Sequence, residues 1–233
     1  MRMIGILGGM SAASTQIYYR TLCDLTRARL GGLHSPELLI RSLDFAQIEA
    51  LQAAGNWDSA AAILNAEARA LAAGGADLLL MATNTMHKLA GPVMQGVSIP
   101  LLHIADATAA RILSAGCKAP ALMATAFTMQ QDFYVGRLRD AGLAVLIPEP
   151  DDRQATHRII YDELCRDIVR PESRQMFEAI ATRLIARGAD SLILGCTEIG
   201  MLLNQTNVAV PVFDTTLIHC EAALDLALQD PRS

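Results

Sequence analysis

One cysteine of the chain stands where a thiol could act on a bound molecule. Cys196 directly follows the strand-like run 190–195 and precedes Thr197 and Glu198. If a helix begins there, its dipole and free N–H groups favour the thiolate and can lower a cysteine pKa from about 8.5 towards neutrality. The alternative is a buried core cysteine, the usual state of a free thiol. The strand-end position favours a functional thiol that acts as an acid or a base.

A second polar group ends another apolar run, 77–82. Thr83, Asn84 and Thr85 follow it directly. Their hydroxyls, the amide and helix N-terminal N–H groups could together hold a carboxylate. Helix capping is the alternative, because threonine and asparagine cap helices routinely. The neighbouring His87 could orient this site, although a satisfied core histidine is the simpler interpretation.

An internal repeat relates these two groups. Residues 75–83 are Gly-Ala-Asp-Leu-Leu-Leu-Met-Ala-Thr, and residues 188–196 are Gly-Ala-Asp-Ser-Leu-Ile-Leu-Gly-Cys. A second pair of segments also matches: residues 99–103 (Ile-Pro-Leu-Leu-His) and residues 210–214 (Val-Pro-Val-Phe-Asp). The first pair is 113 residues apart, and the prolines of the second pair, Pro100 and Pro211, are 111 residues apart. Any two strand–helix units share some likeness, but two matches in order favour a duplication. Thr83 and Cys196 therefore occupy equivalent places.

Strand and helix patterns alternate along the chain, which predicts parallel sheets covered by helices on both faces. The expected strands are 3–8, 37–43, 77–82, 100–103, 119–124, 144–148, 190–195 and 210–213. The expected helices are 14–30, 58–73, 130–141, 151–167, 171–187 and 215–229.

We expect an α/β fold of two pseudo-symmetric Rossmann-like or flavodoxin-like halves, each a parallel sheet flanked by helices. Residues 1–103 plus 215–233 form the first predicted half, and residues 104–214 form the second. Ligands of open α/β sheets bind beyond the carboxyl ends of the strands. If the halves face each other, Thr83 and Cys196 approach one cleft from opposite sides, and the active site is expected in that cleft.

Composition excludes several classes of protein. The 233 residues are 52% hydrophobic, enough for a sizeable core, and a net charge of −5 without a basic patch argues against nucleic acid. No apolar stretch reaches membrane-spanning length, and the start of the chain lacks the features of a signal peptide. The five cysteines are an odd number and form no CxxC, which argues against a disulfide framework or a zinc site. A cytoplasmic setting is expected.

Cofactor binding is also not expected. Pyridoxal phosphate needs a lysine, and neither of the two lysines, Lys88 and Lys118, stands at an obvious anchoring position. The turn after the first strand places Leu7 and Met10 where a dinucleotide fingerprint needs glycine. The five histidines show no metal-ligand spacing.

Four motifs resemble the aspartate/glutamate racemase family, and the resemblance extends over essentially the whole chain. They are residues 6–11 (Ile-Leu-Gly-Gly-Met-Ser), 83–88 (Thr-Asn-Thr-Met-His-Lys), 101–108 (Leu-Leu-His-Ile-Ala-Asp-Ala-Thr) and 195–200 (Gly-Cys-Thr-Glu-Ile-Gly). The resemblance implies an isomerase that moves the α-proton of an amino acid between two opposed acid/bases, without cofactor or metal. It also implies a homodimer. Cys196 matches the family cysteine directly.

Position 83 departs from the common family pattern, in which a second cysteine is usual. The threonine variant resembles the branch that acts on L-aspartate and L-glutamate. A threonine hydroxyl is a far weaker acid than a thiol, so Thr83 would be a poor resting base. We therefore expect unequal efficiency in the two directions, with Cys196 acting on the L-substrate.

By the same resemblance, six further residues would line the substrate site: Met10, Gln52, Asn84, Thr85, Thr197 and Glu198. The alternatives are ordinary packing for Met10, an exposed helix position for Gln52 and a solvated first-turn position for Glu198. The sequence does not choose between aspartate and glutamate, since no basic residue can be placed beside the substrate side chain. The remaining cysteines, Cys23, Cys117, Cys165 and Cys220, are predicted packing residues.

Two rival functions remain open. Arylmalonate decarboxylases resemble this fold and need only one cysteine to protonate a carbanion, so a single-thiol lyase is one alternative. A non-catalytic protein that binds small acids on a duplicated α/β scaffold is the other.

Overall fold

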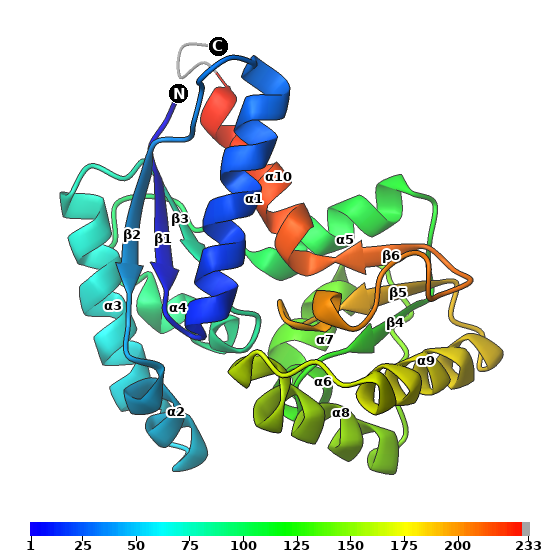
Figure 1. The fold of residues 1–233 in the computed structure, drawn as a ribbon. Coiled ribbons are helices and arrows are strands. Elements are labelled where there is room, and N and C mark those ends of the chain that lie inside the picture. Colours follow the sequence, from blue (N-terminus) through cyan, green and yellow to red (C-terminus); the bar gives the residue numbers. More distant parts are fainter. Residues whose placement is uncertain (230–233) are drawn as a thin grey trace. The chain divides into compact units, whose positions relative to one another are not determined.

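The computed structural model describes residues 1–229 and has two separate three-stranded parallel sheets, in the strand orders β2-β1-β3 and β4-β5-β6 (Figure 1). Helices flank both sheets, which confirms the predicted α/β class. The strands are β1 (Ile4–Gly8), β2 (Leu38–Ser42), β3 (Leu78–Met81), β4 (Pro120–Met123), β5 (Ser191–Leu194) and β6 (Val212–Asp214).

The chain divides into two compact units. Of the described residues, one unit comprises 1–103 and 219–229, and the other comprises 104–218. The division therefore falls inside α10 (Thr215–Leu228), whereas the sequence-based boundary was set just before this helix. Each unit is described separately below.

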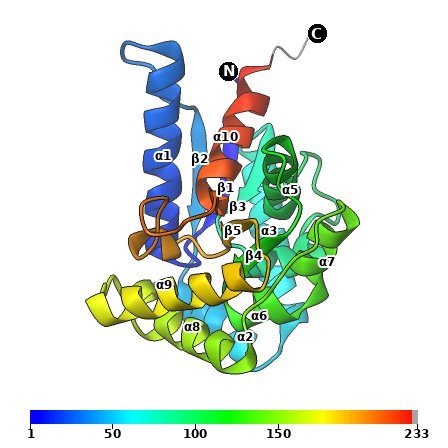
Figure 2. The same ribbon diagram turned by 90° about the vertical axis from the view of Figure 1, so that its right-hand side faces the viewer.

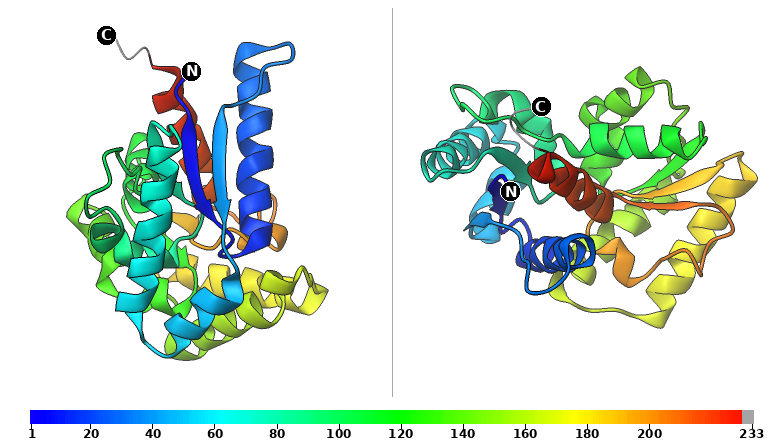
Figure 3. Two further views of the ribbon diagram at one scale, coloured as in Figure 1. Left: turned by 90° about the vertical axis from the view of Figure 1, so that its left-hand side faces the viewer. Right: turned by 90° about the horizontal axis from the view of Figure 1, so that it is seen from above.

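In the first unit, side chains alternate between the two faces of the sheet. Ile4 and Ile6 of β1 pack in one cluster with α1 (Ala12–Leu30) and α10, whereas Leu7 packs in another with α3 (Trp57–Ala73). Figure 3 shows α3 on one face of this sheet and α1 on the other. A strand buried on both faces needs apolar residues throughout, which explains the continuous apolar runs in the sequence.

Shorter elements complete this unit. They are α2 (Phe45–Ala53), the 3₁₀ helix η1 (Thr85–Leu89) and α4 (Ala90–Val93). α2 is not among the helices expected from the sequence; Asp44 caps it by accepting a hydrogen bond from the N–H of Ala46.

The second unit repeats this arrangement. Leu122 and Ala124 at the end of β4 pack with one set of helices, and Ala121 and Met123 pack with the other set. The first set is α5 (Ile104–Ser114), α6 (Ala126–Gln130) and α7 (Asp132–Asp140); the second is α8 (Pro150–Asp162) and α9 (Pro171–Ala186) (Figure 2). Two 3₁₀ helices, η2 (Leu164–Arg166) and η3 (Ile199–Met201), lie in the connections.

The internal repeat extends to individual hydrogen bonds. Asp77 Oδ2 accepts a hydrogen bond from the N–H of Met3 at 2.7 Å, just before β1. Its equivalent, Asp190, accepts hydrogen bonds from Lys118 and Ala119 at 2.6 and 2.9 Å, at the start of β4. Each carboxylate thus satisfies N–H groups where the neighbouring strand begins. The repeated Gly-Ala-Asp sequence therefore serves one structural purpose in both units.

Three sequence-based elements differ from the structure. The expected strands 100–103 and 144–148 are reduced to single β-bridges, at Leu101 and Leu146. Pro100 has no N–H to donate, which limits strand pairing in the segment 100–103. The expected helix 151–167 ends at Asp162, because the chain turns to bury Leu164 in the core and continues as η2. None of the helices that residues 1–229 form combines the length and hydropathy required to cross a bilayer.

Candidate active site

Thr83 lies at the carboxyl edge of the first sheet. Leu7 of β1 is in register with Met81 of β3, so the ends of these strands reach the same edge. The N–H of Ala82 donates to Leu7 O at 2.9 Å, and the Ser14 hydroxyl donates to Ala82 O at 2.8 Å. These bonds fix the backbone immediately before Thr83.

The turn that leaves β1 at this edge depends on a glycine. Gly9 has φ +82°, and a Cβ there would collide with the backbone of Leu43. Its N–H donates to Thr15 Oγ1 at 2.7 Å. Met10 and Ser11 follow, and the Ser11 hydroxyl caps α1. Met10 is thereby placed at the same sheet edge as Thr83.

Behind Thr83 lies a buried histidine. Nδ1 of His87 is 2.8 Å from the carbonyl oxygen of Thr83, and because a carbonyl can only accept, Nδ1 carries the proton. His87 is 2% exposed, and its ring lies 4.5 Å from that of His103 between centroids. His87 is therefore a core histidine that holds the backbone of Thr83.

A third histidine ties α10 to α1. Nε2 of His219 donates to Leu102 O at 2.9 Å, so Nδ1 is the acceptor for the Tyr18 hydroxyl at 2.8 Å. Burial lowers the pKa of His219 to about 4, an effect larger than that of its bond to Leu102. This imidazole is neutral near pH 7 and serves as a structural link.

The other predicted residues of the first unit are buried as well. Asn84 and Thr85 directly follow Thr83 and enter η1, and Gln52 lies on α2 with only 4% of its surface exposed. The alternative of an exposed helix position for Gln52 is therefore wrong. Met10 packs in the cluster around Leu7. That these residues bind substrate stays a prediction.

Cys196 lies at the carboxyl end of the second sheet. Leu194 of β5 is in register with Met123 of β4 and Asp214 of β6, and the N–H of Gly195 donates to Met123 O at 2.8 Å. A Cβ at Gly195 would lie 2.7 Å from a methyl group of Leu122. This glycine therefore allows the side chains of β4 to approach closely just before Cys196.

A buried carboxyl group accepts the hydrogen bond of the Cys196 thiol. Sγ of Cys196 is 2.9 Å from Oε2 of Glu198, and the Thr197 hydroxyl donates to the same oxygen. Glu198 is 3% exposed, so the alternative of a solvated first-turn residue is wrong. The Cys196 side chain itself is partly exposed. The three consecutive residues thus form one connected cluster.

The expected low pKa of Cys196 is not found. Burial raises the pKa of its thiol well above the usual value, and the negative charge of Glu198 raises it further. The predicted helix start is also missing, since only the single-turn η3 follows. Cys196 therefore rests as a thiol that donates to Glu198.

A second thiol reaches Glu198 from η2. Sγ of Cys165 is 3.9 Å from the other carboxyl oxygen, Oε1. Burial and the charge of Glu198 raise the Cys165 pKa to about 12. The sequence predicts Cys165 as a packing residue, because no motif or spacing links it to Cys196. The turn after α8, which the helical sequence pattern of residues 151–167 does not indicate, brings Cys165 next to Glu198.

The two strand ends each carry part of the predicted site. The first unit brings Met10, Thr83, Asn84 and Thr85 to one sheet edge, and the second brings Cys196, Thr197 and Glu198 together. Among the residues that the structure describes, no group of three or more histidine, cysteine or acidic side chains could hold a metal ion.

Each of the two α/β units has a parallel sheet with polar side chains at its carboxyl edge, so the chain has a duplicated α/β fold. Comparison with protein families specifies the class further. The model of the Asp/Glu/hydantoin racemase family matches residues 7–223, and the chain belongs to this family.

Several relatives agree with this assignment. The chain is 26% identical to the broad specificity amino-acid racemase RacX of Bacillus subtilis (strain 168) over 92% of its own length and 93% of the relative. The crystal structure of a candidate Asp/Glu racemase from Yersinia pestis is 46% identical in sequence and has a TM-score of 0.92. The match covers 98% of this chain and 100% of that chain. An aspartate racemase homologue from Pyrococcus horikoshii OT3 is 33% identical, with a TM-score of 0.87 and the same coverage.

Proposed function

We propose that the protein interconverts the L- and D-forms of aspartate or glutamate, with Cys196 and Thr83 moving the α-proton on opposite faces of the substrate. Membership of the racemase family supports an amino acid as substrate. The similarity to an aspartate racemase homologue and to a candidate Asp/Glu racemase supports an acidic one.

The contact between Cys196 and Glu198 carries the proposal. A thiol must lose its proton before it can remove one from carbon, and Glu198 Oε2 stands 2.9 Å from Sγ to receive it. The resulting thiolate removes the α-proton of the L-substrate and becomes a thiol again. The electron pair of the broken C–H bond remains on the substrate as a carbanion.

Thr83 completes the transfer in this proposal. Its hydroxyl donates a proton to the opposite face of the carbanion, which yields the D-isomer and leaves an alkoxide. The proton held by Glu198 then returns to Thr83 through solvent. The same alkoxide must form before Thr83 can act as the base on the D-substrate, so kcat and KM can each differ between the two directions, while kcat/KM is equal because the enantiomers have equal free energy.

The remaining predicted residues have binding roles in this proposal. Asn84 and Thr85 offer an amide and a hydroxyl for the substrate carboxylate, and Met10, Gln52 and Thr197 would complete the site. Glu198 acts on the proton of Cys196 instead of binding substrate. A homodimer, which the resemblance implies, and a cytoplasmic setting, which the cysteine pattern favours, both stay predictions. Analytical ultracentrifugation can test the homodimer.

A chiral assay tests the proposal. The purified protein is incubated with each common amino acid in either configuration, with a metal chelator and no added cofactor, and the enantiomers are separated chromatographically. We expect racemisation of aspartate or glutamate, with a higher kcat from the L-form and equal kcat/KM from the two forms. Failure to racemise any amino acid, together with carbon dioxide release from an arylmalonate, would establish the lyase instead. Binding without α-proton exchange would establish a non-catalytic protein.

A further inference from the structure

The carboxyl group of Glu198 has a thiol on each side. Cys196 donates to Oε2 at 2.9 Å, and Cys165 donates to Oε1 at 3.9 Å. The two thiols come from different parts of the unit, one from the end of β5 and one from η2. The orientation of the carboxyl group is thus set from both sides.

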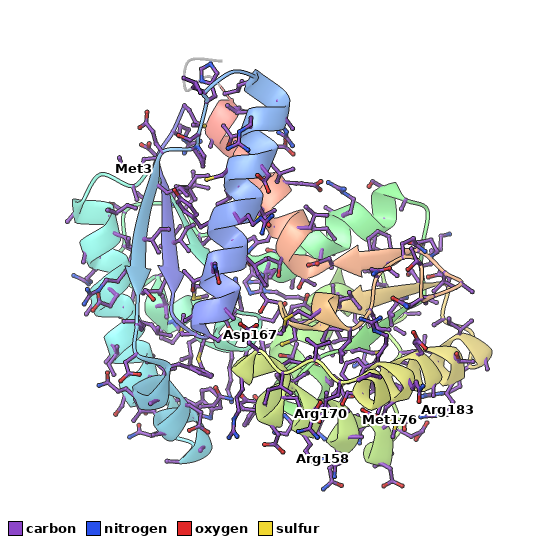
Figure 4. All side chains as sticks on the ribbon, viewed as in Figure 1. Met3, Arg158, Asp167, Arg170, Met176 and Arg183 are labelled. Carbon is purple, nitrogen blue, oxygen red and sulfur yellow. The ribbon has the colours of Figure 1, made fainter. Side chains whose placement is uncertain are left out.

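The backbone around Cys165 is well supported. The N–H groups of Arg166 and Ile168 both donate to Glu163 O, at 2.9 and 3.0 Å. The Ser173 hydroxyl, at the start of α9, donates to the side chain of Glu163 at 2.5 Å. Leu164 is fully buried beside Cys165. Figure 4 labels Asp167 and Arg170 on the segment that joins this turn to α9.

We propose that Cys165 is a positioning residue, which holds the carboxylate of Glu198 so that Oε2 faces the thiol of Cys196. The effect of this positioning on catalysis rests on the proposed function. The positioning itself is a property of the three side chains and can be measured without substrate.

Simple chemistry supports this assignment. A carboxylate that accepts hydrogen bonds on only one oxygen can rotate, whereas donors on both oxygens fix it. Because the pKa of Cys165 is raised to about 12, its thiol stays protonated and keeps donating across the working pH range. Cys165 is therefore a constant neutral donor, whereas Cys196 is the thiol that loses its proton.

Other titratable groups act differently on this cluster. The charge of Glu198 raises the pKa of Cys196, and Cys165 is the other titratable group that acts on that thiol. Asp214, at the end of neighbouring β6, directs its own carboxylate to the N–H groups of Thr216 and Leu217. A change at Cys165 is thus expected to reach Cys196 through Glu198.

The test compares variants of Cys165 by the pH dependence of Cys196 alkylation. Intact protein is treated with iodoacetamide, and modification of the peptide that contains Cys196 is followed by mass spectrometry. Cys165→Ala removes the donor, Cys165→Val removes it while keeping the volume, and Cys165→Ser retains a hydroxyl donor. Cys23→Ala is the matched control, because Cys23 is also partly buried but belongs to the other unit.

We expect the alkylation midpoint of Cys196 to move to lower pH by about one unit in Cys165→Ala and Cys165→Val, since the carboxylate charge is no longer held against the thiol. Cys165→Ser and Cys23→Ala should keep the wild-type midpoint. If the racemase is active, kcat should fall about tenfold in the alanine and valine variants with KM nearly unchanged.

A double-mutant cycle separates positioning from a general structural effect. Glu198→Gln removes the charge and should give the largest shift, and adding Cys165→Ala to it should produce no further change. A wild-type midpoint in both Cys165→Ala and Cys165→Val would overturn the proposal. So would a shift that persists in the Glu198→Gln background. Neither result depends on racemase activity, so failure of the proposed function would be seen separately.

Discussion

The position of one proton decides what Cys196 can do. Its pKa is raised first by burial and then by the charge of Glu198, so the thiol is the resting form. The same carboxylate that disfavours the thiolate is also the acceptor that lies within hydrogen-bonding distance of Sγ. Glu198 therefore changes from a predicted binding residue to the proposed proton acceptor of Cys196.

Kinetics of Glu198→Gln distinguish these two roles. The amide keeps the shape but cannot accept the thiol proton as readily, so we expect kcat to fall roughly 10²-fold with little change in KM. Steady-state assays with the L-substrate measure both constants. A raised KM with unchanged kcat would instead show that Glu198 binds substrate.

The identity of residue 83 controls the reverse direction in this account. Thr83→Cys would introduce a more acidic group, and we expect kcat from the D-substrate to rise at least severalfold relative to kcat from the L-substrate, with a matching rise in the ratio of the KM values because kcat/KM must stay equal for two enantiomers. Thr83→Ser, which keeps a hydroxyl, should preserve the wild-type ratio. Chiral chromatography of both reactions gives the rates, and an unchanged ratio in Thr83→Cys would leave Thr83 as a backbone-capping residue.

Among the structural elements, α10 is joined to α1 by the buried pair of His219 and Tyr18. Folding lowers the pKa of His219 from about 6.5 to about 4, so the unfolded chain binds more protons between these values. Stability should therefore be constant above about pH 6.5 and fall as the pH drops towards 4, by up to about 3 kcal/mol.

Denaturant titrations across this pH range measure the effect. His219→Gln should be less stable at pH 7 but should lose this part of the pH dependence. The exposed His34, changed to glutamine, serves as the matched control and should keep the wild-type slope. An identical slope in wild type and His219→Gln would contradict the assignment of this buried neutral imidazole.

The strands that carry the site could be predicted from the sequence because they are continuous apolar runs. β1, β3 and β5 all lie within their expected ranges. The expected strand at 100–103 failed because pairing there is limited to one bridge, at Leu101. Strand propensity describes a segment, whereas the extent of a ladder depends on neighbours that are distant in the chain.

Side-chain chemistry was less accessible to sequence reasoning. The repeat singled out Thr83 and Cys196, but the raised pKa of Cys196 depends on burial and on the rotamer of Glu198. Cys165 was missed because its contact with Glu198 arises from the turn after Asp162, inside a segment with a helical pattern. Contacts between residues about thirty positions apart leave no local signal in a single sequence.

Over the whole molecule, duplication has preserved the architecture and changed the chemistry. A Gly-Ala-Asp segment leads into β3 in one unit and into β5 in the other, and its aspartate accepts hydrogen bonds from N–H groups at the start of β1 and β4, respectively. The equivalent strand ends nevertheless carry a hydroxyl at position 83 and a thiol at position 196. These unequal groups at equivalent places fit the different roles proposed for Thr83 and Cys196.

Isotope exchange in heavy water tests most directly whether Cys196 and Thr83 serve opposite faces of one substrate. The wild type should form deuterated D-isomer from L-aspartate or L-glutamate. Thr83→Ala should exchange the α-proton of the L-form without forming the D-isomer, and Cys196→Ala should do neither with the L-form. D-isomer formation by Thr83→Ala at the wild-type rate, or exchange of the L-form by Cys196→Ala, would contradict the two-residue mechanism.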